Sequence, residues 1–248
     1  MAARGSGQAW PKLGGYRCGG VTAAAEGRLS CRSLSTCPTT MPPSASDPSA
    51  ASPRDPELLR QAIVSGDPAR AMPALANLRD LEEGQATPLL LLGLEQEPFL
   101  IRSLACAGLG IKRSEAGWRA LVAALQGDGD ANVRAEAANS LASYGLERAW
   151  PLLHHAFAVD GQWLVRCSIL SALAEQPAIP LEWLRDLAEL AISADDGTVR
   201  VGGAEILGRL VREAPQALAD QARGLLAPLQ ADADHRVVAA VLNGLQQG

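Results

Sequence analysis

The stretch DANVRAEAANSL at residues 130–141 decides the fold, because variants of it recur along the chain at a nearly fixed interval. Its central arginine has counterparts at intervals of 32, 32 and 34 residues, which gives the series Arg102, Arg134, Arg166 and Arg200. A fifth copy at 236–240 has Val238 in place of the arginine. A repeat of this length predicts a solenoid of stacked helical hairpins, in which each repeat packs mainly on its neighbours.

A row of tryptophans keeps the same interval. Trp118, Trp150 and Trp183 lie 32 and 33 residues apart, and each opens an apolar run. We interpret them as a repeated packing position between neighbouring hairpins. The alternative is an aromatic row that stacks on a planar ligand.

Composition agrees with a helical solenoid. Of the 248 residues, 48% are hydrophobic but only 4% are aromatic, so the core is built from Ala, Leu and Val. Ala and Leu are strong helix formers, and strict strand-like alternation is rare in this sequence. No uninterrupted apolar run reaches about 18 residues, so we expect no membrane span.

Charge is unevenly distributed. Residues 1–40 carry five basic residues against Glu26 alone, whereas the whole chain has a net charge of −5. The repeat region is therefore acidic. Because nucleic-acid binding depends on neutralising phosphates, we expect no nucleic-acid partner.

Residues 1–54 lack helical periodicity and are predicted to be a disordered segment. Residues 1–40 are rich in Arg and Ser and nearly free of acidic residues, as an organelle transit peptide is. Alternatively, translation begins at Met41 and the preceding residues are an upstream extension. We expect a cytoplasmic protein, or a plastid protein if the transit peptide is real.

Helix-breaking clusters divide the rest of the chain, residues 55–248, into one repeat domain. Asp55 and Asp67 each precede a proline, which is a strong signal for the start of a helix. Short Gly, Asp and Pro clusters then recur every 12 to 18 residues. The segments between them predict six hairpins, at 55–81, 85–111, 115–145, 147–176, 180–213 and 215–247.

An acidic residue precedes most of the repeat arginines. We expect Asp130, Asp160, Asp196 and Asp234 to cap the second helices of their hairpins and to accept hydrogen bonds from arginines of neighbouring repeats. This ladder is predicted to be structural. A row of arginines that faces an acidic ligand is the functional alternative.

The unit Asp-x-x-Val-Arg-x-x-Ala-x-x-x-Leu, seen at 130–141 and with small changes at 196–207, resembles the HEAT-like repeat. More narrowly, it is similar to the short-repeat group named after phycobilisome lyases. The resemblance covers about residues 85–247. It implies an all-α, right-handed solenoid of about six hairpins. It also implies either a plain binding scaffold or a relative of the lyases that attach phycobilins to phycobiliproteins.

We expect the chain to be a non-catalytic scaffold that binds another protein. In such solenoids the second helices line the concave face, and their exposed polar positions are predicted to contact the partner: Glu136, Asn139, Ser140, Ser143, Ser168 and Ser171. The alternative is a phycobilin lyase subunit or phycobilisome chaperone that presents a bilin to a phycobiliprotein. No cofactor is expected for the scaffold, and a phycobilin for the alternative.

No residue set predicts catalysis or metal binding. Cys106 and Cys167 have apolar neighbours and are interpreted as small core residues. Cys18, Cys31 and Cys37 complete an odd number of cysteines that fits neither a zinc site nor a disulfide framework. None of the three histidines precedes a glutamate, so the His-Glu iron ligands of the HEAT-like deoxyhypusine hydroxylases are absent.

Overall fold

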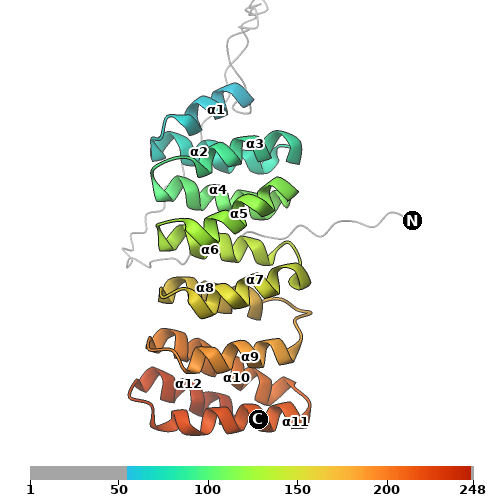
Figure 1. The fold of residues 1–248 in the computed structure, drawn as a ribbon, viewed down its shortest axis with the longest axis vertical. Helices are drawn as coiled ribbons and strands as arrows, with labels where there is room; N and C mark the ends of the chain where they lie inside the picture. Colours follow the sequence, from blue (N-terminus) through green and yellow to red (C-terminus); the bar gives the residue numbers. More distant parts are fainter. Residues whose placement is uncertain (1–54, 247–248) are drawn as a thin grey trace, which may run out of the picture. The chain divides into compact units, whose positions relative to one another are not determined.

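The computed structural model describes residues 55–246, in which all regular structure is helical (Figure 1). The first helices of the six hairpins are α1 (Pro56–Val64), α3 (Glu83–Leu94), α5 (Glu115–Gly127), α7 (Leu146–Val159), α9 (Leu181–Ile192) and α11 (Gln216–Leu226). The second helices are α2 (Pro68–Asn77), α4 (Phe99–Lys112), α6 (Ala131–Ala142), α8 (Trp163–Ala174), α10 (Gly197–Glu213) and α12 (His235–Gln246). Short 3₁₀ turns follow α2 at Leu78–Asp80 and α11 at Ala227–Ala231. The structure confirms the predicted all-α repeat solenoid, while the predictions for residues 1–54 lie outside the described residues.

Local capping explains where several helices begin. The side chain of Asp55 accepts a hydrogen bond from the backbone N–H of Glu57, and Asp67 caps α2 in the same way, each with a proline at the first helical position. Asp130 and Asp196 cap α6 and α10 through the same type of contact. These carboxylates satisfy N–H groups that have no partner within the helix.

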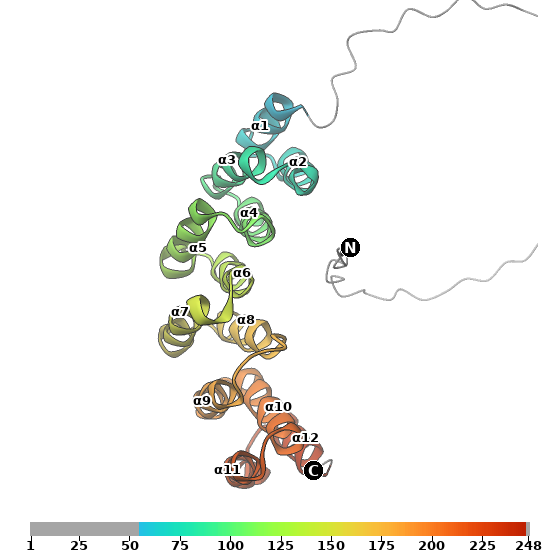
Figure 2. The same cartoon turned by 90° about the vertical axis from the view of Figure 1, so that its right-hand side faces the viewer.

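The helices form two layers along the stack (Figure 2). Odd-numbered helices make one layer, and the even-numbered helices make the other, on the inner side of the shallow curve that residues 55–246 describe. The residue before each repeat arginine points into the core between the layers. These residues have no exposed surface: Ile101, Val133, Val165, Val199 and, in the fifth copy, Val237. Their burial fixes which side of each inner helix faces the core.

The last two inner helices approach each other at backbone distance. A Cβ atom added to Gly208 in α10 would lie 2.8 Å from the Cα of Gly244 in α12. Only glycine allows helices to pass this closely without displacing one of them. The terminal hairpin therefore packs on its neighbour through a close glycine contact as well as through buried apolar side chains.

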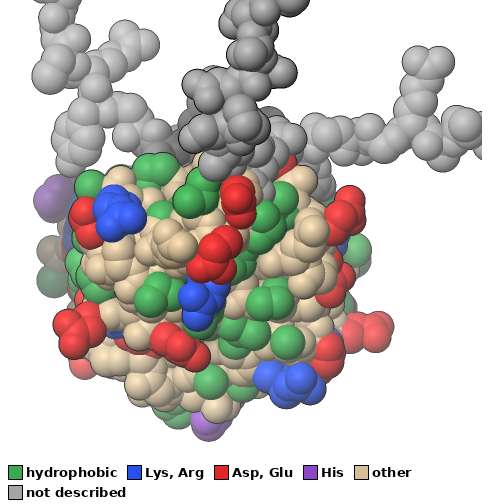
Figure 3. Space-filling view, turned by 90° about the horizontal axis from the view of Figure 1, so that it is seen from above, with side chains coloured by type: hydrophobic (Ala, Val, Ile, Leu, Met, Phe, Trp, Pro, Cys, Tyr) green, Lys and Arg blue, Asp and Glu red, His purple; other side chains and the backbone are tan. Residues whose placement is uncertain are grey.

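The surface of the α1 end carries no extended patch of one charge among the side chains that Figure 3 colours. Acidic, basic and hydrophobic side chains are interspersed there (Figure 3). In the part of the chain that the structure describes, no helix combines the length and apolar character needed to cross a bilayer.

Candidate functional site: a groove across three inner helices

A ladder of arginines sets the spacing of the inner helices. The Nε of Arg134 donates to Oδ2 of Asp160 at 2.8 Å, and its Nη2 donates to Oδ1 at 3.2 Å. Its Nη1 donates to the backbone carbonyl of Asp128 at 2.9 Å. One guanidinium therefore ties the loop of its own repeat to the loop of the next.

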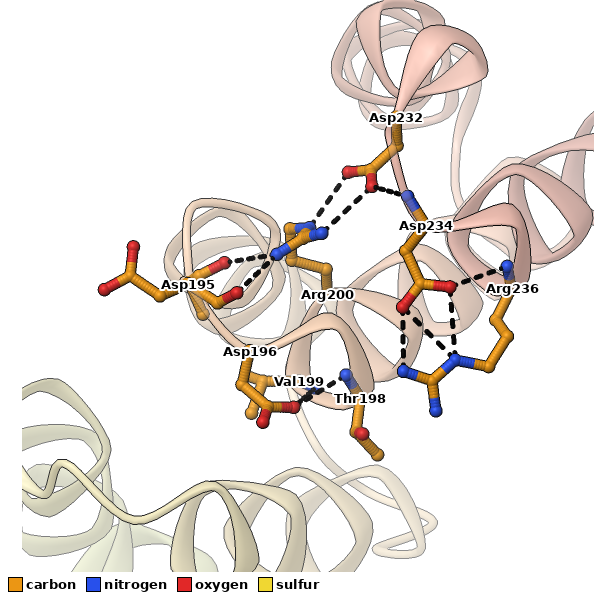
Figure 4. A network of polar contacts seen from close by, with 9 residues as sticks. Asp195, Asp196, Thr198, Val199, Arg200, Asp232, Asp234 and Arg236 are labelled. Carbon is orange, nitrogen blue, oxygen red and sulfur yellow. Dashed lines mark hydrogen bonds and ion pairs between the residues drawn. The ribbon is translucent and has the colours of Figure 1, made fainter.

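Two further arginines make the same contacts. Arg102 holds the carboxylate of Asp128 with bonds of 2.8 and 3.0 Å. Arg200 holds Asp232 with two bonds of 2.9 Å and also donates to the carbonyl of Ala194 (Figure 4). The side chains in the three pairs are only 10–19% exposed. Bidentate pairs this well buried are among the stronger polar contacts in proteins.

The predicted partners were partly wrong. The ladder carboxylates are Asp128, Asp160 and Asp232, which lie six residues before the arginine position of their own repeat. Asp130 and Asp196 instead cap their own helices, and Asp234 pairs with Arg236. The reason is the turn geometry: the side chain four residues before the arginine position points back to the helix N-terminus, and the one six residues before points toward the preceding repeat.

Arg166 is the exception in the ladder. The next repeat has Ala194 at the ladder position, so it offers Arg166 no carboxylate there. The Nε of Arg166 donates to the carbonyl of Asp160 at 2.7 Å, and its guanidinium carbon lies 5.8 Å from the centre of the Phe157 ring. The ladder is therefore interrupted between the fourth and fifth hairpins.

Ladder contacts shift the acidity of their carboxylates. Burial raises the pKa of Asp160, but hydrogen bonds from Arg134 and from the backbone N–H of Gln162 outweigh it, so the net pKa is lowered. The pKa of Asp128 is lowered by the same balance. The pKa of Asp232 is lowered chiefly by its hydrogen bond from Arg200. The carboxylates therefore stay ionised in the folded protein at neutral pH.

The repeated tryptophans pack against the core and against side chains of their own or a neighbouring repeat. Trp150 and Trp183 stack with ring centres 4.8 Å apart. The guanidinium of Arg148 covers Trp118 at 3.9 Å while Arg148 also pairs with Glu115. This arrangement favours the packing interpretation over stacking on a planar ligand, because these ring faces already have partners within the chain.

A groove of about 530 Å³ crosses α4, α6 and α8 on the inner layer. Four of the six residues predicted to contact a partner line it: Glu136, Asn139, Ser168 and Ser171. The lining also includes Phe99, Leu100, Ser103, Asn132, Ala135, Leu164 and Cys167. Residues from three successive repeats thus meet on one surface.

The other two predicted contact residues are engaged between helices. Ser140 is buried and its hydroxyl donates to the carbonyl of Cys106 at 2.9 Å, so the prediction that it is exposed was wrong. Ser143 donates to the carbonyl of Gly110 at 2.7 Å. Both hydroxyls join α6 to α4, because small side chains allow these helices to approach closely. Ser168 lines the groove but donates to the carbonyl of Ala135.

Sequence reasoning missed the apolar side of the groove. Phe99 and Leu100 are 38% and 44% exposed at the start of α4, and Trp163, beside the lining residue Leu164, is 48% exposed at the start of α8. The sequence did contain a signal for these walls. Two bulky apolar residues lie three and two positions before both Arg102 and Arg166, whereas Ala131 and Asn132 occupy these positions in the middle repeat. The starts of α4 and α8 therefore form two apolar walls, and the start of α6 between them carries smaller and more polar side chains.

Titratable groups of the groove and of the core are desolvated. Burial raises the pKa of the Glu136 carboxyl, against a lowering effect of its hydrogen bond with Asn139. Burial also raises the pKa of Cys167, and it raises that of the buried Cys106 to about 12. The hydroxyl of Ser103 is inaccessible to water and has no hydrogen-bond partner in the described part of the chain. At neutral pH, the two thiols are therefore protonated and poorly nucleophilic.

The histidines do not gather at the groove. His154 packs on Trp150 with ring centres 5.1 Å apart, and His155 and His235 are exposed. Within residues 55–246, no group of three or more His, Cys, Asp or Glu side chains is arranged to hold a metal ion.

Comparison with known proteins identifies the type of repeat. Residues 87–174, which span the groove-forming helices, match the family model of HEAT repeats. This matched part of the chain is therefore similar to HEAT repeats. No curated protein matches its sequence.

Two solved structures are similar to the chain at low identity. The crystal structure of an engineered protein has a TM-score of 0.49 and 19% identity, covering 78% of this chain and 96% of its own. Human deoxyhypusine hydroxylase in complex with glycerol has a TM-score of 0.35 and 14% identity, covering 79% of this chain and 96% of its own. Neither is similar enough to bear on function.

Proposed function

We propose that this HEAT-like protein is a non-catalytic scaffold that binds another protein in the groove across α4, α6 and α8. The observation that carries the proposal is a pair of apolar walls, formed by the exposed Phe99 and Leu100 on one side and the half-buried Leu164 on the other. Exposed apolar patches rimmed by polar residues are typical of protein-binding surfaces. Helical repeat proteins commonly use their inner surface in this way.

The chemistry of the lining supports binding rather than turnover. Cys167 has the most nucleophilic type of side chain in the groove, but burial raises its pKa and disfavours the reactive thiolate. The hydroxyl of Ser168 is committed to the carbonyl of Ala135. Among residues 55–246, neither group forms a hydrogen bond with a basic side chain that would activate it.

Bulky substitutions in the groove test this proposal. We expect Asn139→Trp and Ser171→Trp to abolish capture of the partner by the tagged full chain in extracts of the native organism. Both positions are exposed, so circular dichroism and the melting temperature should stay unchanged. Ala123→Trp, at an exposed position on α5 in the outer layer, is the matched control and should retain the partner. Retention by both groove variants, or loss with the control, contradicts the proposed site.

The phycobilin lyase alternative gives a different result with the same preparation. A lyase subunit or bilin chaperone should keep the colour of an added phycobilin through gel filtration. It should also increase covalent attachment of the bilin to a phycobiliprotein subunit. A colourless protein with no effect on attachment supports the scaffold.

A further inference from the structure

The groove has a single charged position between its apolar walls. Among the described residues that line it, Glu136 is the one with a charged side chain. It lies on α6, the middle of the three helices, with Phe99 and Leu100 on α4 and Leu164 on α8 as the walls. The carboxyl group of Glu136 therefore lines the same groove as these walls.

Glu136 differs from the three ladder carboxylates of the solenoid. Asp128, Asp160 and Asp232 each face an arginine at 2.8–2.9 Å. The contact that Glu136 makes is with the neutral amide of Asn139. Burial without a cation is costly for a carboxylate, and the raised pKa of Glu136 reflects this cost.

A lysine or arginine side chain would supply the cation that Glu136 lacks among the lining residues of the groove. Its hydrocarbon stem can pack between apolar walls while its charged end pairs with a carboxylate. An aromatic ring such as Phe99 adds a favourable surface for the cation. A partner anion would instead be repelled by Glu136, and a purely apolar side chain would deepen the desolvation of its carboxylate.

We propose that the partner of this groove is a protein segment that inserts a Lys or Arg side chain, flanked by apolar side chains, and pairs it with Glu136. This inference rests on the proposed function and specifies the partner by its chemistry. The walls supply most of the contact area, and the ion pair supplies the selection for a basic residue.

Selection from random peptides tests the inference without knowledge of the partner. A phage library of random dodecapeptides is selected on the immobilised full chain, and the enriched peptides are synthesised with a fluorescent label. We expect them to carry Lys or Arg next to Leu, Ile, Val or Phe. Fluorescence anisotropy then measures their dissociation constants. Glu136→Gln should weaken binding about tenfold or more, since a partly desolvated ion pair contributes at least that factor.

Two controls isolate the ion pair. Replacing the basic residue of the peptide by norleucine should weaken binding to the native chain, and this modified peptide should no longer distinguish native protein from Glu136→Gln. Glu205→Gln removes the same charge from an exposed position on α10 and should leave the affinity unchanged.

The outcomes separate the inference from the function on which it rests. Enriched peptides that lack a basic residue, or that bind Glu136→Gln equally well, yet are blocked by Asn139→Trp, overturn the inference and leave the groove as a binding site. No enrichment over an uncoated surface, or binding that Asn139→Trp does not reduce, overturns both.

Discussion

Replacing Arg134 by methionine should destabilise the solenoid more than the same change at Arg166. Arg134→Met removes two charge-assisted hydrogen bonds to Asp160 and one bond to the carbonyl of Asp128. It also leaves the carboxylate of Asp160, whose side chain is 11% exposed, without its cation. Losses of this kind cost about 2–3 kcal/mol.

Arg166→Met is the matched control that the chain itself provides. It removes one hydrogen bond to the carbonyl of Asp160 and a distant contact with Phe157, and it leaves no carboxylate unpaired. The expected cost is about 1 kcal/mol. Both substitutions keep a long apolar stem, so the loss of side-chain packing is similar in the two variants.

Equilibrium urea unfolding followed by circular dichroism measures the difference. The free energy of unfolding should fall by about 1–2 kcal/mol more for Arg134→Met than for Arg166→Met, and the melting temperature by about 2–8 °C more. A cycle with Asp160→Asn should show a coupling of about 1 kcal/mol or more between Arg134 and Asp160. Equal losses in the two methionine variants, or additive effects in the cycle, would refute the assignment of the ladder as a source of stability.

Three further predictions follow from the same geometry. Ala194→Asp places a carboxylate at the empty ladder position and should raise the free energy of unfolding by about 1 kcal/mol, a gain that Arg166→Met should abolish in a urea titration. Arg113→Gly should raise the melting temperature, because Arg113 ends α4 in the left-handed conformation at φ 54°. This conformation costs a non-glycine residue about 1 kcal/mol. Lys112→Gly, inside the helix, should lower the melting temperature. The folded-state pKa of Asp160 is depressed, so its stabilisation is present above the unfolded pKa of about 4 and is lost as pH falls through the folded value. Urea midpoints measured between about pH 5 and 2 should therefore decline more steeply for the native chain than for Arg134→Met.

Periodic positions were predictable because their roles are local. The arginine register was visible in the sequence, and the residue before the arginine position is buried in each of the last five hairpins. The helix boundaries follow from caps, prolines and glycines that act within a few residues of the chain. The resemblance to HEAT repeats could be recognised from one twelve-residue unit, because each repeat of a solenoid packs on its neighbours with similar residues at the same positions.

Contacts between repeats were harder to predict. Asp128 and Asp130 are both acidic, both near the start of α6 and equally plausible partners for Arg102, yet only Asp128 points toward the preceding repeat. Ser140 and Asn139 are adjacent polar residues on one helix, but Ser140 is buried against α4 and Asn139 is exposed in the groove. Adjacent residues on an α-helix are rotated by about 100°, so their side chains point in different directions. How α6 packs on α4 decides which of the two side chains is buried.

By itself, the sequence determined the architecture: helical hairpins in number and order, the aspartate caps of several helices, and a core built mainly from Ala, Leu and Val. These features depend on spacing within a repeat, which the chain displays directly. Only the tertiary structure decided which carboxylate pairs with each arginine, that the ladder is interrupted at Ala194, and that Phe99, Glu136 and Cys167 share one groove. The three groove residues come from three successive repeats, and the stagger and rotation of stacked helices, set by side-chain packing, bring them together.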